Sequence, residues 1–175
     1  MLTSAFELGE ELVKKRIEYK LHQPLWSKFD LNGINLEHSN WTTIKFLNND
    51  STDFSDQIGE LPNDSGGLYL FCIRCQVIPG ITNYPVYVGR AQLSEGQNLR
   101  KRCREYFTKW ARNNERPLIT KMINYWGNEL YLSFMEVEEN EDIIDFENKL
   151  IKSLLLPFNN DIPDKEIRQS VKAFP

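Results

Sequence analysis

Gly67-Leu-Tyr-Leu-Phe-Cys-Ile73 and Pro85-Val-Tyr-Val-Gly89 are the stretches of sequence that decide the fold. Both are short runs rich in aromatic, β-branched and other apolar residues, which is typical of β-strands. Pro79-Gly80 lies between them and is a turn signal. We therefore predict a β-hairpin. Gly89 ends its second strand, where the missing side chain lets the backbone or a ligand approach closely.

Helical patterns follow the hairpin. The sequence predicts a helix over 98–113 that Asn98 can cap, and a second helix over 117–127 that opens on a proline. A third strand is predicted over 129–137, followed by a helix over 140–154 and a short helix from about residue 164. Three short strands with helices between and after them indicate an α/β fold, in which helices flank a small central sheet that is mixed or antiparallel.

The part before the hairpin is predicted to be an N-terminal extension, residues 1–65, preceding a core domain of residues 66–175. A helix is expected over 5–21 and a strand over 41–46. The stretch 47–67 is crowded with Asn, Asp, Ser, Gly and Pro, so it is the candidate boundary. The extension would recognise substrate or pack on the core.

Length and composition indicate a globular protein, because 175 residues with 41% hydrophobic side chains can bury a core. The sequence lacks a long apolar run and a secretory leader, and its three cysteines give no disulfide framework, so we expect a soluble, cytoplasmic protein.

The charge is unevenly distributed along the chain. A net charge of −4 argues on average against a non-specific nucleic-acid binder. Between Gln97 and Lys121, however, eight basic residues stand against two acidic ones. Four of the eight, on the 98–113 helix, are candidates for salt-dependent, sequence-independent phosphate contacts: Arg100, Lys101, Arg104 and Lys109.

Glu147 is an unusual residue for its position on the 140–154 helix. It falls among Ile143, Leu150, Ile151 and Leu154, at spacings that place the carboxylate inside the apolar stripe. An unpaired buried carboxylate costs several kcal/mol. Glu147 therefore needs a metal ion, an arginine from a facing element, or a proton. Among the arginines, Arg102 is the one expected to compete with a metal ion for this carboxylate.

The 98–113 helix carries two stripes. Its predicted core face consists of Leu99, Cys103, Phe107 and Trp110. Arg102 and Tyr106 lie four residues apart beside that face and are therefore neighbours. A guanidinium next to a phenol can bind a phosphate. The alternative is a solvated basic face with Tyr106 packed at its edge.

Five short motifs occur in a telling order: Gly67-Leu-Tyr69, Tyr87-Val-Gly89, the basic helix, Glu147-Asn-Lys-Leu-Ile151 and Phe158-Asn159. Over about residues 66–160 this order resembles the GIY-YIG nuclease superfamily, and it is similar to the N-terminal nuclease domain of UvrC repair proteins. Leu68 and Val88 replace isoleucines of the two signature motifs. Residues 92–97 look like an insertion before the basic helix.

The resemblance implies a role for each matching residue. It implies a tyrosine pair, a catalytic arginine, a helix tyrosine, a metal-binding glutamate and a supporting asparagine at Tyr69, Tyr87, Arg102, Tyr106, Glu147 and Asn159. Glu147 would hold one Mg²⁺ or Mn²⁺, hard cations that suit carboxylate and water ligands. Arg102 would neutralise the phosphate in the transition state, and Arg90 can approach the same phosphate.

The general base is left open between two tyrosines. A free tyrosine has a pKa near 10, so only about one molecule in a thousand is phenolate at neutral pH, although nearby positive charge narrows that gap. We expect Tyr69 to act as base or to position the water, with Tyr87 supporting it, but the reverse assignment fits the sequence equally. Asn159 would hold the end of the Glu147 helix or the tyrosine network.

These observations predict a metal-dependent endonuclease that hydrolyses DNA phosphodiester bonds, with a role in restriction or another defence against foreign DNA. The alternatives are a non-catalytic nucleic-acid-binding module on the same fold, a repair or recombination nuclease, and a protein-interaction domain that uses the N-terminal segment. The sequence does not separate DNA from RNA. Cutting both strands would need two such sites, as in a homodimer.

Overall fold

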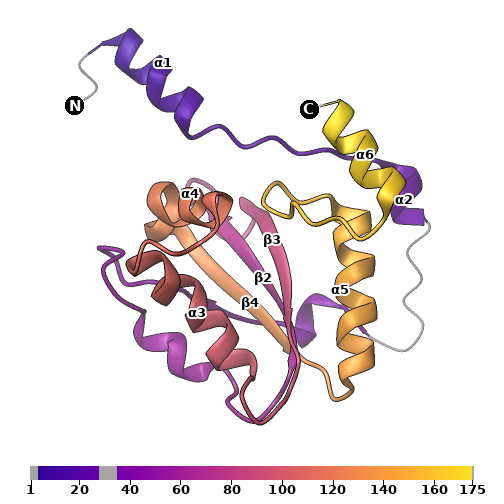
Figure 1. Ribbon diagram of the computed structural model, residues 1–175. Coiled ribbons are helices and arrows are strands. Elements are labelled where there is room, and N and C mark those ends of the chain that lie inside the picture. Colours follow the sequence, from indigo (N-terminus) through magenta and orange to yellow (C-terminus); the bar gives the residue numbers. More distant parts are fainter. Residues whose placement is uncertain (1–3, 28–34, 175) are drawn as a thin grey trace.

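The computed structural model describes residues 4–27 and 35–174, and its centre is a four-stranded antiparallel sheet in the order β1-β4-β2-β3. The strands are β1 (Thr42–Lys45), β2 (Gly67–Arg74), β3 (Asn83–Ala91) and β4 (Leu130–Glu136). The predicted hairpin and the α/β class are confirmed (Figure 1). The prediction of three strands is wrong, because β1 pairs with β4 along its whole length and extends the sheet.

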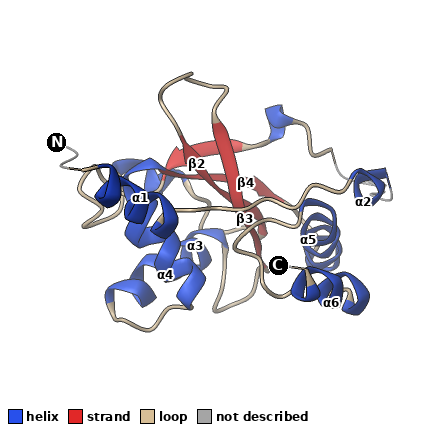
Figure 2. Ribbon diagram, turned by 90° about the horizontal axis from the view of Figure 1, so that it is seen from above, coloured by secondary structure: helices blue, strands red, loops and turns tan. Residues whose placement is uncertain are grey.

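Helices cover both faces of this sheet (Figures 1 and 2). One face packs against α3 (Leu99–Ala111) and α4 (Pro117–Trp126), and the other against α5 (Asn140–Leu154), with α6 (Lys165–Ala173) beside it. Alternate residues of β2 serve the two layers, as the two-residue period of a strand requires. Tyr69 and Phe71 point towards α3 and α4, whereas Leu68 packs with Phe146 of α5.

Local signals account for the ends of these helices. The Asn98 side chain accepts a hydrogen bond from the Lys101 N–H at 2.9 Å and caps α3 as predicted. Pro117 occupies the first turn of α4, and the Asp164 side chain caps α6. Leu155 adopts the left-handed conformation (φ 45°) that stops α5.

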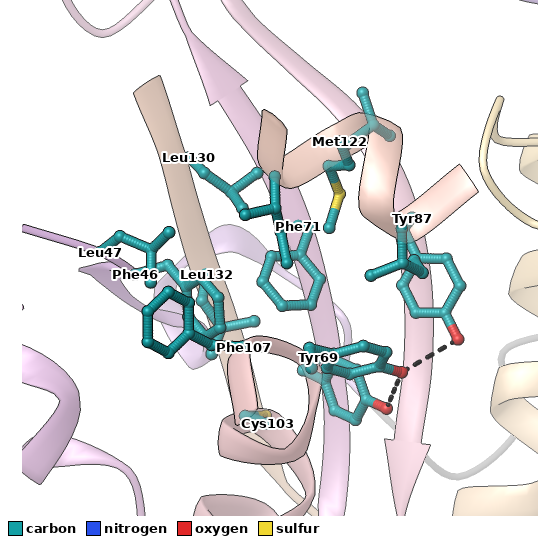
Figure 3. Close-up of a cluster of buried hydrophobic side chains, with 14 of the residues drawn as sticks. Phe46, Leu47, Tyr69, Phe71, Tyr87, Cys103, Phe107, Met122, Leu130 and Leu132 are labelled. Atoms are coloured by element: carbon teal, nitrogen blue, oxygen red, sulfur yellow. Dashed lines mark hydrogen bonds between the residues drawn. The ribbon is translucent and has the colours of Figure 1, made fainter. Parts of the chain in front are cut away.

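The larger core lies between the sheet and the α3–α4 layer, with Phe71 near its middle (Figure 3). The Phe71 ring makes edge contacts with Phe46 at 4.9 Å and with Tyr106 at 5.4 Å between centroids. Phe46, Leu47 and Leu61 are fully buried in the same core. Residues on both sides of the expected 47–67 boundary therefore share one core.

The N-terminal helix is shorter than predicted. It spans α1 (Ala5–Lys14), and residues 15–22, which we call the strap, run extended from α1 to the short helix α2 (Gln23–Ser27) (Figure 1). Tertiary contacts explain the difference, because the side chains of Lys121 and Lys20 bond the strap to α4 and to the end of α6. No helix in the described ranges is long and apolar enough to cross a membrane.

Candidate active site

A cleft of about 990 Å³ opens beside β3, the edge strand where the α3–α4 layer and α5 come together. Five of the residues expected to act on substrate line it: Tyr87, Arg90, Arg102, Glu147 and Asn159. They come from β3, α3, α5 and the loop after α5. The 92–97 segment, expected to be an insertion, contributes part of the same wall.

The three predicted tyrosines form one hydrogen-bonded chain (Figure 3). The hydroxyls of Tyr69 and Tyr106 are 2.8 Å apart, and Tyr106 donates to the Tyr87 oxygen at 3.1 Å. Tyr69 and Tyr106 are buried at 0% and 2% exposure and do not line the cleft. Tyr87 is the member of the chain that reaches it.

Burial also sets the protonation of the two inner phenols. Burial raises the pKa of Tyr69 well above its usual value, and the nearby Arg102 charge opposes this only in part. Burial likewise raises the pKa of Tyr106. Both phenols are therefore neutral at physiological pH and suited to donating and accepting hydrogen bonds.

Gly89 lets the Tyr69 ring pack directly against β3. A Cβ added there would lie 2.6 Å from the Tyr69 hydroxyl oxygen and 2.7 Å from two ring carbons. Such distances are shorter than any tolerable contact, so the ring would have to move. The glycine thus holds the inner end of the tyrosine chain in place.

Gly89→Ala is therefore expected to lower the free energy of unfolding by about 1–3 kcal/mol, the usual range for overpacking a buried site. Chemical denaturation of both proteins measures this difference. Gly96→Ala is the matched control, because an added Cβ meets nothing within 4 Å there. Equal losses at the two glycines would contradict the steric explanation.

Glu147 is paired with Arg90. The side chain of Glu147 is only 14% exposed, and its Oε2 contacts a terminal nitrogen of Arg90. Burial raises the pKa of Glu147, and the Arg90 charge offsets part of that effect. The direct partner is thus Arg90 and not the expected Arg102, which lines the same cleft and acts on the carboxylate only through its charge.

The Glu147 carboxylate also fits a divalent cation. It lies on the wall of a cleft with room for a hydrated ion, and its burial favours any cation that can neutralise it. Within the described ranges, no three His, Cys, Asp or Glu side chains cluster as a metal site would. An ion held by one carboxylate, water and substrate oxygens needs no such cluster.

Arg102 is oriented by its own helix. Its guanidinium donates to Glu105 at 3.0 Å and lies 5.4 Å from the centroid of the Tyr106 ring. Glu105 is itself held by Lys109 at 3.0 Å and Gln97 at 2.8 Å. This network keeps the Arg102 charge at the cleft, beside the tyrosine chain.

Asn159 holds the loop after α5 against β3 through two hydrogen bonds. Its amide accepts from the Val88 N–H at 2.9 Å and donates to the Val88 carbonyl at 2.8 Å. Both bonds are to the residue that follows Tyr87. Asn159 therefore supports the strand that carries Tyr87, and not the end of the Glu147 helix.

The four α3 residues expected to contact phosphate do not line the cleft. Arg100 donates to the carbonyls of Leu61 at 2.6 Å and Gly59 at 2.7 Å, and the Arg104 guanidinium stacks 4.8 Å from the Phe54 ring centroid. Lys109 pairs with Glu105, and Lys101 lies near the Gly96 carbonyl at 3.4 Å. Of the five predicted nucleic-acid-binding residues, only Arg90 reaches the cleft.

Sequence reasoning missed Arg116. This residue precedes the first turn of α4, lines the cleft, and donates to the Tyr87 hydroxyl at 3.4 Å. The sequence feature that could have identified Arg116 is its position directly before Pro117, because a proline in the first turn fixes where the helix begins. Tyr106 and Arg116 both donate to the Tyr87 oxygen.

The cleft thus combines one phenol, three guanidinium groups and a largely buried carboxylate. Guanidinium groups around one space suit a phosphate group, and Glu147 is the carboxylate beside them that would hold a metal ion. Comparison of the chain with protein-family models, with curated proteins and with solved structures gave no match.

Proposed function

We propose that the protein is a metal-dependent endonuclease that hydrolyses DNA phosphodiester bonds at this cleft through a single-metal Tyr/Arg/Glu site. The observation that carries the proposal is the convergence of Tyr87, Arg102 and Glu147 on one space from β3, α3 and α5. The order of these residues along the chain, which resembles the GIY-YIG superfamily, supports the same function.

Arg102 and Arg116 bind and neutralise the phosphate from the α3–α4 side of the cleft. Their guanidinium groups are held by neighbouring acids, at 3.0 Å from Glu105 and at 3.3 Å from Glu115. Fixed donors of this kind stabilise the charge that develops on phosphate oxygens without first reorganising. Arg90 joins them from β3 whenever its partner carboxylate is occupied by another cation.

Glu147 is the residue that would hold one Mg²⁺ or Mn²⁺. When bound, the ion supplies positive charge beside the phosphate and acidifies water. Arg90 contacts Oε2 of the same carboxylate, so Arg90 and the ion compete for this side chain.

In this proposal the phenolate form of Tyr87, which has first given its own proton to solvent, accepts the proton of the attacking water, and Tyr69 acts through the chain behind it. Tyr87 faces the cleft, while its oxygen already accepts from Tyr106 and Arg116. Tyr69 is buried at the other end of the chain, where it bonds Tyr106 and lies beside Arg102. Asn159 fixes the strand on which Tyr87 lies.

For the biological role we propose restriction or another defence against foreign DNA, because the arrangement of residues that precede the first signature motif and complete the core is similar to the layout of small restriction endonucleases in this superfamily. Cleavage of both strands would then require a homodimer or two sequential events. A repair or recombination nuclease would instead favour branched or damaged substrates in a mixed-substrate assay.

Arg102→Ala is expected to lower the rate of plasmid nicking by about 100- to 1,000-fold, the usual effect of removing one preorganised donor to a transition-state oxyanion. Nicking is followed with Mg²⁺, with Mn²⁺ and with chelator. Arg102→Lys is expected to recover only part of the rate, because an ammonium cannot donate in the planar, two-pronged manner of a guanidinium. Wild-type binding without cleavage across metals and substrates would favour the non-catalytic module.

A further inference from the structure

A second groove of about 630 Å³ adjoins the catalytic cleft. The two share Leu118 on one side and the 158–160 loop on the other. A chain-like ligand leaving the cleft past this loop therefore enters the second groove directly.

The strap forms one wall of this groove. It passes α4 and reaches α6, as Figures 1 and 2 show. Lys121 of α4 donates to the Arg16 carbonyl at 3.3 Å, and Lys20 donates to the carbonyls of Val171 at 3.1 Å and Phe174 at 2.6 Å. The apolar side chain of Ile17 packs against the core. The strap is thus a fixed part of the groove.

The groove is strongly basic in a chain whose net charge is −4. Four cationic side chains line it, from the strap, α4 and α6: Arg16, Lys20, Lys121 and Lys172. Glu18 is the acidic residue among the lining side chains, and it is paired with Arg16. The bonds of Lys20 and Lys121 go to neutral carbonyls, so both ammonium groups keep their charge unneutralised.

We propose that this groove binds the phosphate backbone of the DNA on one side of the cleaved bond, so that the strap is part of the substrate-binding surface. The inference rests on the proposed function, since the ligand is the DNA that enters the cleft. Continuity with the cleft and the excess of positive charge carry it. The α3 surface is a weaker candidate, because Arg100 and Arg104 are engaged in packing.

The test measures binding of a fluorescent DNA duplex across a NaCl series, without divalent metal and in a Glu147→Gln background. The triple variant Arg16→Gln/Lys20→Gln/Lys121→Gln keeps amide donors for the strap bonds but removes three charges. The logarithm of affinity falls as the logarithm of salt concentration rises, and each lost phosphate contact makes this negative slope shallower by about 0.9. We expect the triple variant to make the slope shallower by about 2 to 3, and to do so equally for DNA duplexes of unrelated sequence.

Lys172→Gln is the second variant, because it leaves the bonds of Lys20 and Lys121 in place and should make the slope shallower by about 1. The matched comparison is Lys101→Gln/Arg104→Gln/Lys109→Gln on α3. A larger effect from the α3 triple, or unchanged slopes in both groove variants, overturns the groove proposal even if the wild type cleaves DNA. Groove-dependent binding by a wild type that never cleaves would overturn the nuclease proposal and leave the groove as a DNA-binding surface beside the cleft.

Discussion

Glu147→Gln is expected to reduce DNA cleavage by about 1,000-fold or more while DNA binding in the absence of metal is retained. The amide has nearly the shape of the carboxylate but carries no charge to hold a divalent cation. Charge stabilisation by such an ion contributes several kcal/mol, and about 1.4 kcal/mol corresponds to tenfold in rate. Single-turnover cleavage with Mg²⁺ and with Mn²⁺ measures the effect.

The same substitution should also abolish Mn²⁺ binding measured by calorimetry, which separates loss of the ion from loss of a proton acceptor. Asp142→Asn is the matched control, because it removes an exposed carboxylate from the first turn of the same helix. It should leave cleavage unchanged. Rapid cleavage by Glu147→Gln would return this residue to a purely structural ion pair with Arg90.

Tyr87→Phe is expected to lower the single-turnover rate by about 100- to 10,000-fold, the range for removing a positioned general base. Tyr87 lines the cleft, and the substitution deletes only its hydroxyl oxygen, which accepts from Tyr106 and Arg116. Arg116 and Tyr106 lose their shared acceptor but remain in place. Substrate affinity should change little, since Arg90 and Arg102 still line the cleft.

Tyr69→Phe is the informative comparison. It removes a hydroxyl that is fully buried and bonded to Tyr106, so it should cost about 1–3 kcal/mol of stability. Its effect on rate should be smaller than that of Tyr87→Phe, because Tyr69 does not line the cleft. If Tyr69→Phe proves the more damaging to catalysis at equal folded fraction, the two tyrosines exchange roles.

Local sequence patterns predicted most elements of the fold. The 98–113 and 140–154 helices and the hairpin appear within a few residues of their expected bounds, because caps, turn residues and apolar periodicity act over short distances. The strand expected over 41–46 is also present, but its place in the sheet was not predicted. Pairing of β1 with β4 joins segments about ninety residues apart, which no local pattern encodes.

The strap is a segment that local patterns wrongly predicted to be helical. A helix was expected to continue to residue 21, yet it ends at Lys14 because Lys20 and Lys121 find carbonyl partners across the fold. A helical propensity of a few tenths of a kcal/mol per residue is easily outweighed by such contacts.

The sequence alone determined the type of chemistry at the cleft: which helix carries a carboxylate on its apolar side, which carries an arginine next to a tyrosine, and which strands carry the other tyrosines. Only the tertiary structure decided the partners. It paired Glu147 with Arg90, turned Arg100 and Arg104 away, buried Tyr69 and brought Arg116 to Tyr87. Periodicity assigns a side chain to a face, but its partner depends on which elements the folded core makes neighbours.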